Sequence, residues 1–547
     1  MNAGYLILDC FVDEPACLGV PPFVAPYPRY IYGALTASGI PPEHITYKTI
    51  DYLRERDYRL EGDYSIVFLI GGAVVPGKYL GYKIGTLAEI RSIIGYNPRI
   101  PFAVGGLVSH ALKEDYSPNA TFLLCDIEKY ASNFVKGNLR DEFRTIRDIQ
   151  EWSVLGSDVV LQHPDYPQII CEIETYRGCP RQQHCSFCSE SLQHTLDFRE
   201  QNHILDEIKS LCLQGIKRFR LGRQADILQY KTEYKEFRNG FPRPSVNETG
   251  SLFASLKSLR EVYAIDIFID NANPGTILNF PEDSETILKS IADTITPGDT
   301  LALGVESLDP NVVLRNNLKI HQADLITVID IVNRLGGRRV DGITQLLPGI
   351  NLIHGLPGES RNTFKINYEG LLAIAERGLL LKRINIRKIL PFPGTKAFME
   401  KHVINEHLKN RYEYYKNKIR HDIDGPMLKR VFPVGLILRN LRVEDQRYEY
   451  SYARQLASYP ITCIIPEKLP LKSFLDVLVV GHRERSLIAL PHPIHINQLS
   501  QKSLEAIPGV SRGLAREIIH QRPFPDRGTL LMLMQNINPV MTAHLDL

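Results

Sequence analysis

The chain has 547 residues, a mass of 62.1 kDa and a formal net charge of +2, with 44% hydrophobic and 23% charged residues. At about 100 to 200 residues per domain this length predicts three to four domains, and the composition is that of a globular chain and excludes wholesale disorder. The near-neutral charge excludes a chain-wide attraction to nucleic acid or to an anionic membrane, so any such affinity requires a local patch.

No apolar run approaches the roughly 18 residues that a membrane helix needs, and the N-terminus MNAGYLILDCFVDEP lacks the basic region of a signal peptide. We therefore expect no membrane partner and a cytoplasmic location. In that compartment cysteines stay reduced, and a close group of them indicates metal binding or catalysis more readily than a disulfide.

Residues 1–145 are predicted to form a doubly wound α/β domain. Short apolar runs that end in glycine alternate here with amphipathic segments, which is typical of a parallel sheet. These runs lie at residues 5–11, 64–72, 100–110 and 120–127. Ligands of such sheets lie beyond the carboxyl ends of the strands, where Gly105 and Gly106 fall. Tight turns alone would also explain these glycines.

A polar linker at 146–168 leads to a second alternating segment, residues 169–400. Its first predicted helix, HILDEIKSLCLQG, places Ile204, Ile208 and Leu211 on one apolar stripe. Six successive βα units predict a complete or partial parallel barrel of the TIM type, with its chemistry at the C-terminal ends of the strands. Cys179 follows the first of these strands.

The pattern changes beyond residue 400. Residues 401–490 are predicted to form a basic helix and a small β-barrel. The helix carries Tyr412, Tyr414 and Tyr415 among its lysines and arginines, which suits either a phosphate-tracking surface or a solvated face with rings partly in the core. Residues 491–547 predict two short helices joined by a Pro-Gly turn, and the start of the second helix presents backbone N–H groups to an anion such as phosphate.

Three of the nine cysteines lie within ten residues, in the segment RGCPRQQHCSFCSE. They are Cys179, Cys185 and Cys188. A structural zinc ion requires four ligands, and the nearby candidates for the fourth are His184, which directly precedes Cys185, and His194. An iron–sulfur cluster takes thiolate ligands, and three thiolates on a four-iron cube leave one iron open to bind and activate another molecule.

This segment resembles the cluster-binding motif of the radical S-adenosylmethionine superfamily. The usual spacing is C-x-x-x-C-x-x-C with an aromatic before the last cysteine; here the first gap holds five residues, and Phe187 stands at the aromatic position. The resemblance implies a 4Fe-4S cluster on Cys179, Cys185 and Cys188. It also implies that the open iron chelates S-adenosylmethionine, which is cleaved to a 5′-deoxyadenosyl radical.

Later segments match further signatures of the superfamily in the expected order. The residues that they assign to cofactor binding are Gly222, Arg223, Gln224, Glu306, Ser307, Gly355, Leu356 and Pro357. The first three occupy the place of a Gly-Gly-Glu-like turn that holds the methionine amino group, although the acidic residue is missing. The resemblance implies that Glu306 and Ser307 lie near the ribose or amino group and that the Gly355 loop lies beside the adenine.

The N-terminal domain resembles the cobalamin-binding domains that precede such cores. This implies that Gly105 and Gly106 approach the corrin or its nucleotide tail, because only glycine lets the backbone come that close. The domain lacks the D-x-H-x-x-G motif, so no lower axial histidine is assigned. The alternative is a domain that has lost cobalamin and kept a packing or substrate role.

The C-terminal segment resembles helix-hairpin-helix modules, which hold nucleic-acid phosphates with the backbone amides of the turn. The resemblance assigns this contact to Gly509, Val510, Ser511 and Arg512. Ser511 replaces the second glycine of the usual turn and can cap the second helix. The alternative is a small helical cap that packs on a neighbour.

The sequence thus predicts an α/β chain with a doubly wound domain, a partial TIM-type (β/α)6 barrel, a small β-rich unit and a C-terminal helical hairpin. The hypothesis is a radical S-adenosylmethionine enzyme that carries out cobalamin-assisted methylation or a related modification of an unactivated carbon, with ferredoxin or flavodoxin as electron donor. The C-terminal module favours a nucleic acid as substrate, and a protein or a small molecule is the alternative. The alternatives are a nucleic-acid-binding protein with a structural iron–sulfur or zinc site, and a sulfur-inserting enzyme. No catalytic base is assigned.

Overall fold

The computed structural model describes residues 4–14, 17–72, 79–115, 117–192, 196–318, 320–400, 405–535 and 537–547. The chain divides into two compact units, each of which is described by itself. Unit 1 comprises Met1–Thr296, Leu314–Lys319 and Ile389–Val403. Unit 2 comprises Pro297–Val313, Ile320–Lys388 and Ile404–Leu547. Among the described residues, no helix combines the length and the apolar character that crossing a membrane requires.

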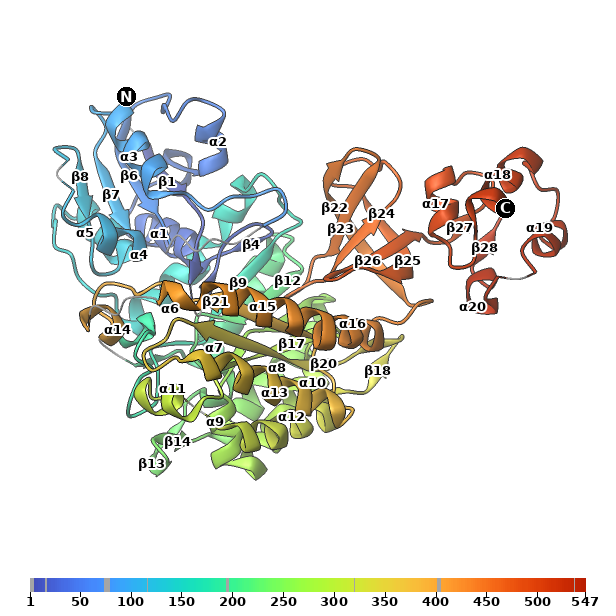
Figure 1. Cartoon of the computed structure of the whole chain (residues 1–547). Coiled ribbons are helices and arrows are strands. Elements are labelled where there is room, and N and C mark those ends of the chain that lie inside the picture. The colour runs from blue at the N-terminus through green and yellow to red at the C-terminus, as the bar shows by residue number, and fades with distance from the viewer. Residues whose placement is uncertain are drawn as a thin grey trace. The chain divides into compact units, whose positions relative to one another are not determined.

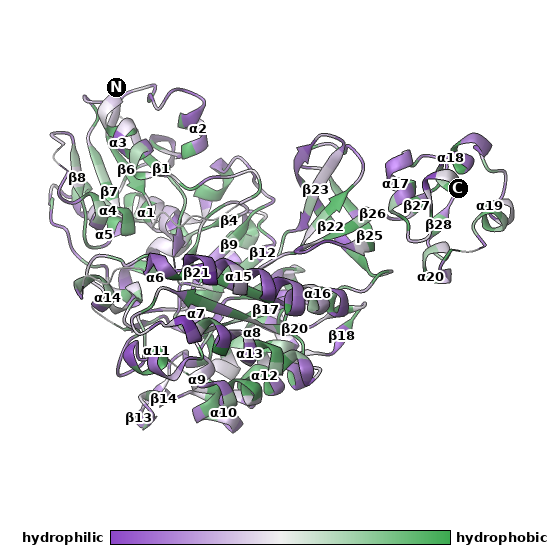
Figure 2. Ribbon diagram, in the orientation of Figure 1, coloured by the Kyte–Doolittle hydropathy of each residue, from purple (hydrophilic) through white to green (hydrophobic). Residues whose placement is uncertain are grey.

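Unit 1 begins with a five-stranded parallel sheet in the order β5-β1-β6-β7-β8 (Figure 1). Its strands are β1 (Gly4–Asp9), β5 (Ile45–Thr49), β6 (Tyr64–Ile70), β7 (Phe102–Gly105) and β8 (Ala120–Phe122). Counted along the chain this is the order 2-1-3-4-5 of one doubly wound class. The central strands are mostly apolar, and Val67 and Leu69 of β6 pack with Phe102 and Val104 of β7 in the core of this sheet (Figure 2). The predicted parallel sheet is confirmed.

The segment predicted as a polar linker forms α6 (Ile146–Leu155) and a 3-10 turn at Gly156–Gln162, and both pack on α1 (Pro26–Ala37). The contact is very close. A Cβ on Gly33 of α1 would lie 2.0 Å from the Trp152 carbonyl oxygen, and one on Gly156 would lie 1.8 Å from that of Arg29. Only glycine at both positions permits this approach of the two backbones.

A second parallel sheet in unit 1 has the order β15-β12-β9-β4. It consists of β4 (Phe23–Val24), β9 (Ile170–Glu174), β12 (Arg218–Gly222) and β15 (Asp266–Ile269). The helices that follow these strands are α7 (Gln201–Leu213), α8 (Val246–Tyr263), α9 (Pro274–Asn279) and α10 (Pro281–Thr294). Helix α7 buries Ile204, Ile208 and Leu211, as its apolar stripe predicted.

Unit 2 contains the next three strands of the predicted βα series. These are β17 (Asp299–Glu306), β20 (Leu346–His354) and β21 (Arg383–Lys388), which lie parallel and adjacent in that order. Helices α12 (Gln322–Gly336) and α13 (Arg361–Glu376) connect them. All six predicted strands of the segment 169–400 therefore form, three in each unit. Within each unit, neighbouring strands of the three pair in parallel.

Helix α15 (Lys409–Ile419) continues through a π-helical turn at Arg420–Asp424 into α16 (Gly425–Val431). Its outer face is hydrophilic, as Figure 2 shows. Tyr412 is buried, with its ring 5.4 Å from that of His354, whereas Tyr414 is 60% exposed. The predicted basic helix is therefore partly a core element and partly a solvated face.

A closed five-stranded barrel follows, in the order β22-β23-β24-β26-β25 (orange in Figure 1). Its strands are β22 (Ile437–Arg447), β23 (Tyr450–Gln455), β24 (Thr462–Ile465), β25 (Phe474–His482) and β26 (Ser486–Pro491). Strands β24 and β26 are parallel and the other pairs are antiparallel. The predicted small barrel is confirmed, and its strand order is that of an OB-fold.

The chain ends in helices that share one hydrophobic core with this barrel. They are α17 (Gln501–Ala506), α18 (Arg512–Gln521), α19 (Arg527–Leu533) and α20 (Pro539–Thr542). Leu504, Ile507 and Val510 of the helical hairpin pack with Leu478 and Leu490 of the barrel. The barrel and the hairpin therefore form one folded module.

We predict that Gly33→Ala destabilises unit 1 by about 1 to 3 kcal/mol, because the added methyl overlaps the Trp152 carbonyl and the helices must separate. Gly95→Ala in α3 (Leu87–Tyr96) is the control, since no atom lies within 4 Å of its Cβ position. Alanine should there stabilise the helix by about 1 kcal/mol. Thermal unfolding of both variants measures the difference, and equal effects would contradict the close packing of α1 on α6.

Candidate cofactor site around the cysteine loop

The three clustered cysteines lie on a loop that follows β10 (Tyr176–Arg177) and turns at Gly178, whose φ is +91°. Cys185 is buried, and Cys179 and Cys188 are half-buried. Burial raises the pKa of the Cys188 thiol well above its usual value, and Glu190, Cys185 and Cys179 raise it further. Within the described ranges, no group of three His, Cys, Asp or Glu side chains is gathered tightly enough for a single metal ion.

Two asparagines hold this loop from the other side. The Asn317 side-chain amide donates to the carbonyls of Gln183 and His184, at 2.7 and 3.2 Å. Asn316 accepts from the Ser186 hydroxyl at 2.6 Å, and the Ser186 N–H donates to the Asn316 carbonyl at 3.2 Å. Asn317 has a φ of +49°, a left-handed conformation that asparagine tolerates better than other side chains. The loop is thus fixed by specific bonds over most of its length.

Arg181 is the charged residue inside the loop. Its Nη1 donates to the Cys185 sulfur at 3.4 Å and to the Asn317 carbonyl at 3.2 Å. The guanidinium lies 4.5 Å from the centre of the Phe241 ring, and only 7% of the residue is exposed. Its Nε has no hydrogen-bond partner among the described residues.

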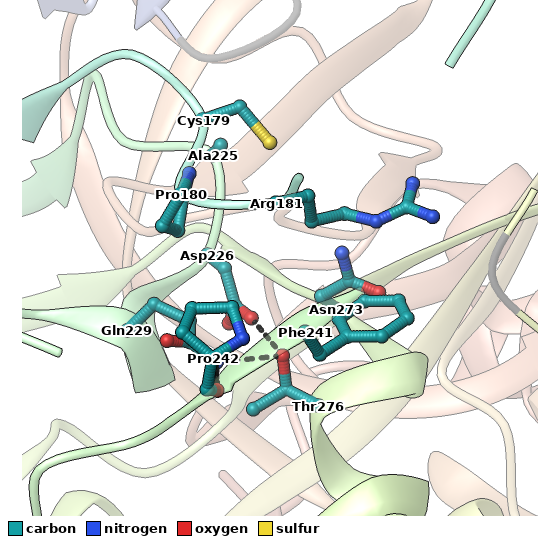
Figure 3. A pocket seen from close by; sticks show the side chains of 10 residues that line it. All are labelled: Cys179, Pro180, Arg181, Ala225, Asp226, Gln229, Phe241, Pro242, Asn273 and Thr276. Atoms are coloured by element: carbon teal, nitrogen blue, oxygen red, sulfur yellow. Dashed lines mark hydrogen bonds between the residues drawn. The ribbon is translucent and has the colours of Figure 1, made fainter. Parts of the chain in front are cut away.

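A small pocket opens beside the first cysteine (Figure 3). Cys179 and Arg181 line it together with Phe241 and Asn273. At its far side the Thr276 hydroxyl donates to Asp226 at 2.6 Å. All of these residues belong to unit 1. The cysteine loop therefore has a small recess at its edge, lined by both polar and apolar side chains.

The turn after β12 contains the three residues predicted to hold the methionine amino group. Gly222 is required because a Cβ there would lie 1.7 Å from the Glu172 carboxylate. Gln224 is buried and donates to the Leu221 carbonyl at 3.0 Å. Arg223 has a φ of +59°, and its Nη1 donates to Glu190 Oε1 at 3.0 Å. The structure therefore places an acidic group, Glu190, at the turn that lacks one in sequence.

Glu190 lies two residues after Cys188 and is 5% exposed. Its Oε2 is buried and has no hydrogen-bond partner among the described residues, and the same holds for Arg223 Nε. A buried carboxylate oxygen without a donor is costly unless a partner satisfies it. The pair thus has one acceptor and one donor left for a ligand.

A chain of buried ion pairs surrounds β9 and its loop. Arg144 donates to Glu128 at 2.6 Å and to Glu174 of β9 at 2.7 Å, and Arg177 donates to Asp126 at 2.7 Å. Burial alone would raise the pKa of Glu174, but Arg144, followed by other nearby arginines, outweighs it and holds that pKa below its usual value. Glu174 is therefore ionised at neutral pH inside the protein.

The residues predicted to contact the ribose and the adenine lie in unit 2. Glu306 ends β17 with a φ of +66°, a strained conformation for a non-glycine residue. Ser307 is buried beside Asn367, at 3.4 Å between Oγ and Oδ1. Gly355 has a φ of +87°, and its N–H donates to Glu359 at 3.0 Å. Leu356 is buried, and Pro357 follows it in the same loop.

Gly105 and Gly106 lie at the carboxyl end of β7, as predicted. A Cβ on Gly105 would lie 2.5 Å from Ile127, and one on Gly106 would lie 2.5 Å from the Gly71 carbonyl oxygen. Gly106 also has a φ of +84°. Both glycines are needed for the close packing of β7 against its neighbours, and protein atoms cover their Cα positions. They therefore do not fit the close approach to a corrin that was predicted for them.

The remaining predicted residues lie as follows. Phe187 is half-buried in the cysteine loop. The ring of His184 is exposed, and its Nε2 lies 3.3 Å from the Cys179 carbonyl oxygen. His194 lies outside the described residues. Gly509 has a φ of +93° in the turn before α18, and Ser511 caps that helix by accepting from the Leu514 N–H at 3.2 Å. Val510 is buried, and the Arg512 side chain is 72% exposed.

Sequence reasoning missed three residues of this site: Arg181, Glu190 and Asn317. The missing acid of the turn at Arg223 was a signal that another carboxylate had to be supplied, and Glu190 lies two residues after the last cysteine. No sequence signal pointed to Asn317, which is far from the cysteines along the chain and comes beside them only through the fold.

No protein-family model matches the chain. Two archaeal proteins are related to it over nearly their whole length. An uncharacterized protein of Archaeoglobus fulgidus is 38% identical over 524 residues, which is 94% of this chain and 95% of that protein. The uncharacterized protein MJ0274 of Methanocaldococcus jannaschii is 38% identical over 506 residues, 88% of this chain and 92% of that protein. The chain belongs to the family of these two proteins.

Solved structures with partial similarity include radical S-adenosylmethionine enzymes. The methyltransferase TsrM from Kitasatospora setae, with cobalamin and a 4Fe-4S cluster bound, has a TM-score of 0.47 and 13% identity over 73% of this chain and 78% of that chain. The cobalamin-dependent radical enzyme OxsB has a TM-score of 0.44 and 13% identity over 76% of this chain and 56% of that chain. Because these TM-scores lie below 0.5, we argue function from the residues of this chain.

We predict that Arg144→Met destabilises the protein by about 3 to 5 kcal/mol at pH 7, because it leaves the carboxylates of Glu128 and Glu174 buried without their cation. Arg91→Met is the matched control, since Arg91 also contacts a carboxylate at 2.6 Å but its side chain is 53% exposed. That substitution should leave stability close to that of the wild type, because water and salt screen an exposed ion pair.

Equilibrium denaturation of both variants at several pH values makes this measurement. The lowered pKa of Glu174 contributes stability above the ordinary carboxyl pKa, and this stability is lost as the pH falls through the folded-state pKa. The difference in unfolding free energy between the wild type and Arg144→Met should therefore become smaller at acidic pH. A gap of the same size at every pH would contradict the role of Glu174.

Proposed function

We propose that the chain is a radical S-adenosylmethionine enzyme whose 4Fe-4S cluster is held by Cys179, Cys185 and Cys188. The observation that carries the proposal is the cysteine loop: three thiols within ten residues, fixed by two asparagines, with a buried guanidinium donating to the Cys185 sulfur. The guanidinium donates to the Cys185 sulfur at 3.4 Å, a contact that would remain available to a cluster-bound cysteine.

When bound and reduced, such a cluster supplies the electron that cleaves S-adenosylmethionine to methionine and a 5′-deoxyadenosyl radical, which abstracts hydrogen from unactivated carbon. The protein's own residues position the reactants. The Asn317 bonds hold the loop, Arg181 compensates negative charge on the sulfurs, and the half-buried Cys179 and Cys188 leave the loop open on one side. Ferredoxin or flavodoxin is the proposed electron donor.

Glu190 and Arg223 are proposed to hold the amino-acid end of S-adenosylmethionine. An ammonium group would satisfy Glu190 Oε2, and a carboxylate would satisfy Arg223 Nε. Burial strengthens both contacts because water does not compete with them. Glu306, Ser307 and the Gly355 loop keep the ribose and adenine roles that the family resemblance assigns.

Methylation of an unactivated carbon with cobalamin stays part of the proposal on the basis of the doubly wound strand order alone. Gly105 and Gly106 pack against Ile127 and the Gly71 carbonyl, so no contact with cobalamin is assigned to them. Titration of the protein with hydroxocobalamin, followed by gel filtration, tests whether the N-terminal domain retains it.

We predict that anaerobically reconstituted protein with dithionite and S-adenosylmethionine releases 5′-deoxyadenosine. Cys179→Ala, Cys185→Ala and Cys188→Ala should each abolish release, because each removes one cluster ligand. Glu190→Gln should keep the cluster and require about tenfold more S-adenosylmethionine for half-maximal release, since it loses a charge-assisted hydrogen bond. Chromatography of the products and iron analysis provide both readouts.

Cys212→Ala in α7 is the control, since this buried cysteine lies outside the loop and should leave release unchanged. A cluster-loaded wild type that releases no 5′-deoxyadenosine would make the cluster structural. That result would favour the alternative of a nucleic-acid-binding protein. Full activity of Cys185→Ala would overturn the ligand assignment.

We further propose that the substrate of this reaction is a nucleic acid bound by the C-terminal module. The supporting observation is the joint core of the barrel and the helical hairpin, with Gly509 in a left-handed turn before α18. Exposed Arg512 and Arg516 lie on the first turns of that helix. Cations there would contact phosphates that the backbone amides of the turn also approach.

For this proposal we predict that Arg512→Glu and Arg516→Glu each weaken the binding of a fluorescent single-stranded RNA by about tenfold at 50 mM salt. In each variant the slope of log affinity against log salt concentration should also become shallower by about one, the loss of one phosphate contact. Arg99→Glu, an exposed arginine of unit 1, makes the same charge change and should have no effect. Equal binding by all three variants would leave the hairpin as a structural cap.

A further inference from the structure

Arg181 has a specific relation to one of the three cysteines. Its Nη1 lies 3.4 Å from the Cys185 sulfur, and its guanidinium is buried against the Phe241 ring at 4.5 Å. A fully ionised side chain is expensive to bury, and Arg181 has no carboxylate within ion-pair distance among the described residues. The surroundings of Arg181 therefore lack the negative partner that this burial requires.

The protein fixes Arg181 where it stands. Nη1 also donates to the Asn317 carbonyl at 3.2 Å, and that carbonyl is aimed by the left-handed backbone of Asn317 and by its two side-chain bonds to the loop. Stacking on Phe241 removes the freedom of the guanidinium to swing into solvent. Asn317 is thus a positioning residue for the contact between Arg181 and the sulfur.

A cluster on this loop would supply the negative partner, because the charge of its three thiolates exceeds the positive charge of the 4Fe-4S core. Hydrogen bonds to the sulfurs and the local charge are two of the factors that set the reduction potential of an iron–sulfur cluster. Reduction adds one electron from the donor, with no proton, so a fixed cation stabilises the reduced form more than the oxidised form. Because the guanidinium is shielded from water, this effect is screened little by salt.

We propose that Arg181 raises the reduction potential of the cluster by its hydrogen bond to the Cys185 sulfur, and so makes it reducible by a ferredoxin or flavodoxin. This inference rests on the proposed function. Arg181 thus sets how readily the cluster accepts an electron, whereas Glu190 and Arg223 bind S-adenosylmethionine.

The test is a potentiometric titration of the reconstituted protein, followed by the electron paramagnetic resonance signal of the reduced cluster. Arg181→Met removes the charge and the donor while keeping an apolar side chain against Phe241. We expect the midpoint potential to fall by at least 59 mV, a tenfold change in the equilibrium constant of a one-electron couple. Arg181→Lys keeps the positive charge but loses the planar guanidinium. Its midpoint potential should lie between those of the wild type and Arg181→Met.

Arg238→Met is the matched control, because Arg238 also stacks on a phenylalanine, Phe280 at 4.8 Å, but pairs with Glu236 and contacts no cysteine in the described structure. It should leave the potential unchanged. Equal potentials in wild type and Arg181→Met would overturn the inference while leaving the proposed function intact. Loss of the cluster in both Arg181 variants would also overturn it, since Arg181 would then be needed to hold the cluster.

A failure of the proposed function gives a different result. If the wild type assembles no 4Fe-4S cluster, or assembles one that does not cleave S-adenosylmethionine, the proposed function fails whatever the potentials are. If the wild type assembles an active cluster, the comparison of Arg181→Met with Arg238→Met decides the inference alone.

Discussion

Buried ion pairs between arginines and carboxylates hold the elements of unit 1 together. Arg29 and Arg199 both contact Glu207 of α7, at 2.9 and 2.6 Å, and Arg144 joins Glu128 to Glu174 of β9. Removing charges from water is costly unless each finds a partner with good geometry. The N-terminal domain supplies Arg29 and Glu128, so it cannot shift against β9 without leaving a charge unpaired. The cysteine loop that follows β9 and β10 is therefore attached to a rigid part of unit 1.

The backbone is unusual at two strand ends. Arg223 follows β12 and Glu306 ends β17, and both have positive φ values that non-glycine residues rarely adopt. Such strain persists where the surrounding contacts determine the conformation, and it is concentrated at functional sites. At Arg223 the ion pair with Glu190 is one such contact. A turn that lacks the expected acid thus recovers it from the segment next to the last cysteine.

The C-terminal module is built on different physics. Its barrel has an apolar interior that continues into the helical hairpin. Helices of six and ten residues such as α17 and α18 would be marginal alone. Packing Leu504, Ile507 and Val510 against the barrel stabilises them and presents the Gly509 turn at the surface.

The sequence by itself determined the parallel sheets, the six strands of the central segment, the small barrel and the cysteine loop, because each depends on local periodicity, glycine position or spacing. It did not determine that residues 146–162 pack on α1, that Gly105 and Gly106 meet Ile127 and Gly71, or that Arg181, Glu190 and Asn317 belong to the site. These depend on contacts between residues distant along the chain, whose distances and partners no local pattern encodes. Tertiary structure alone decided them, because burial makes every charge and every Cβ depend on what the fold brings beside it.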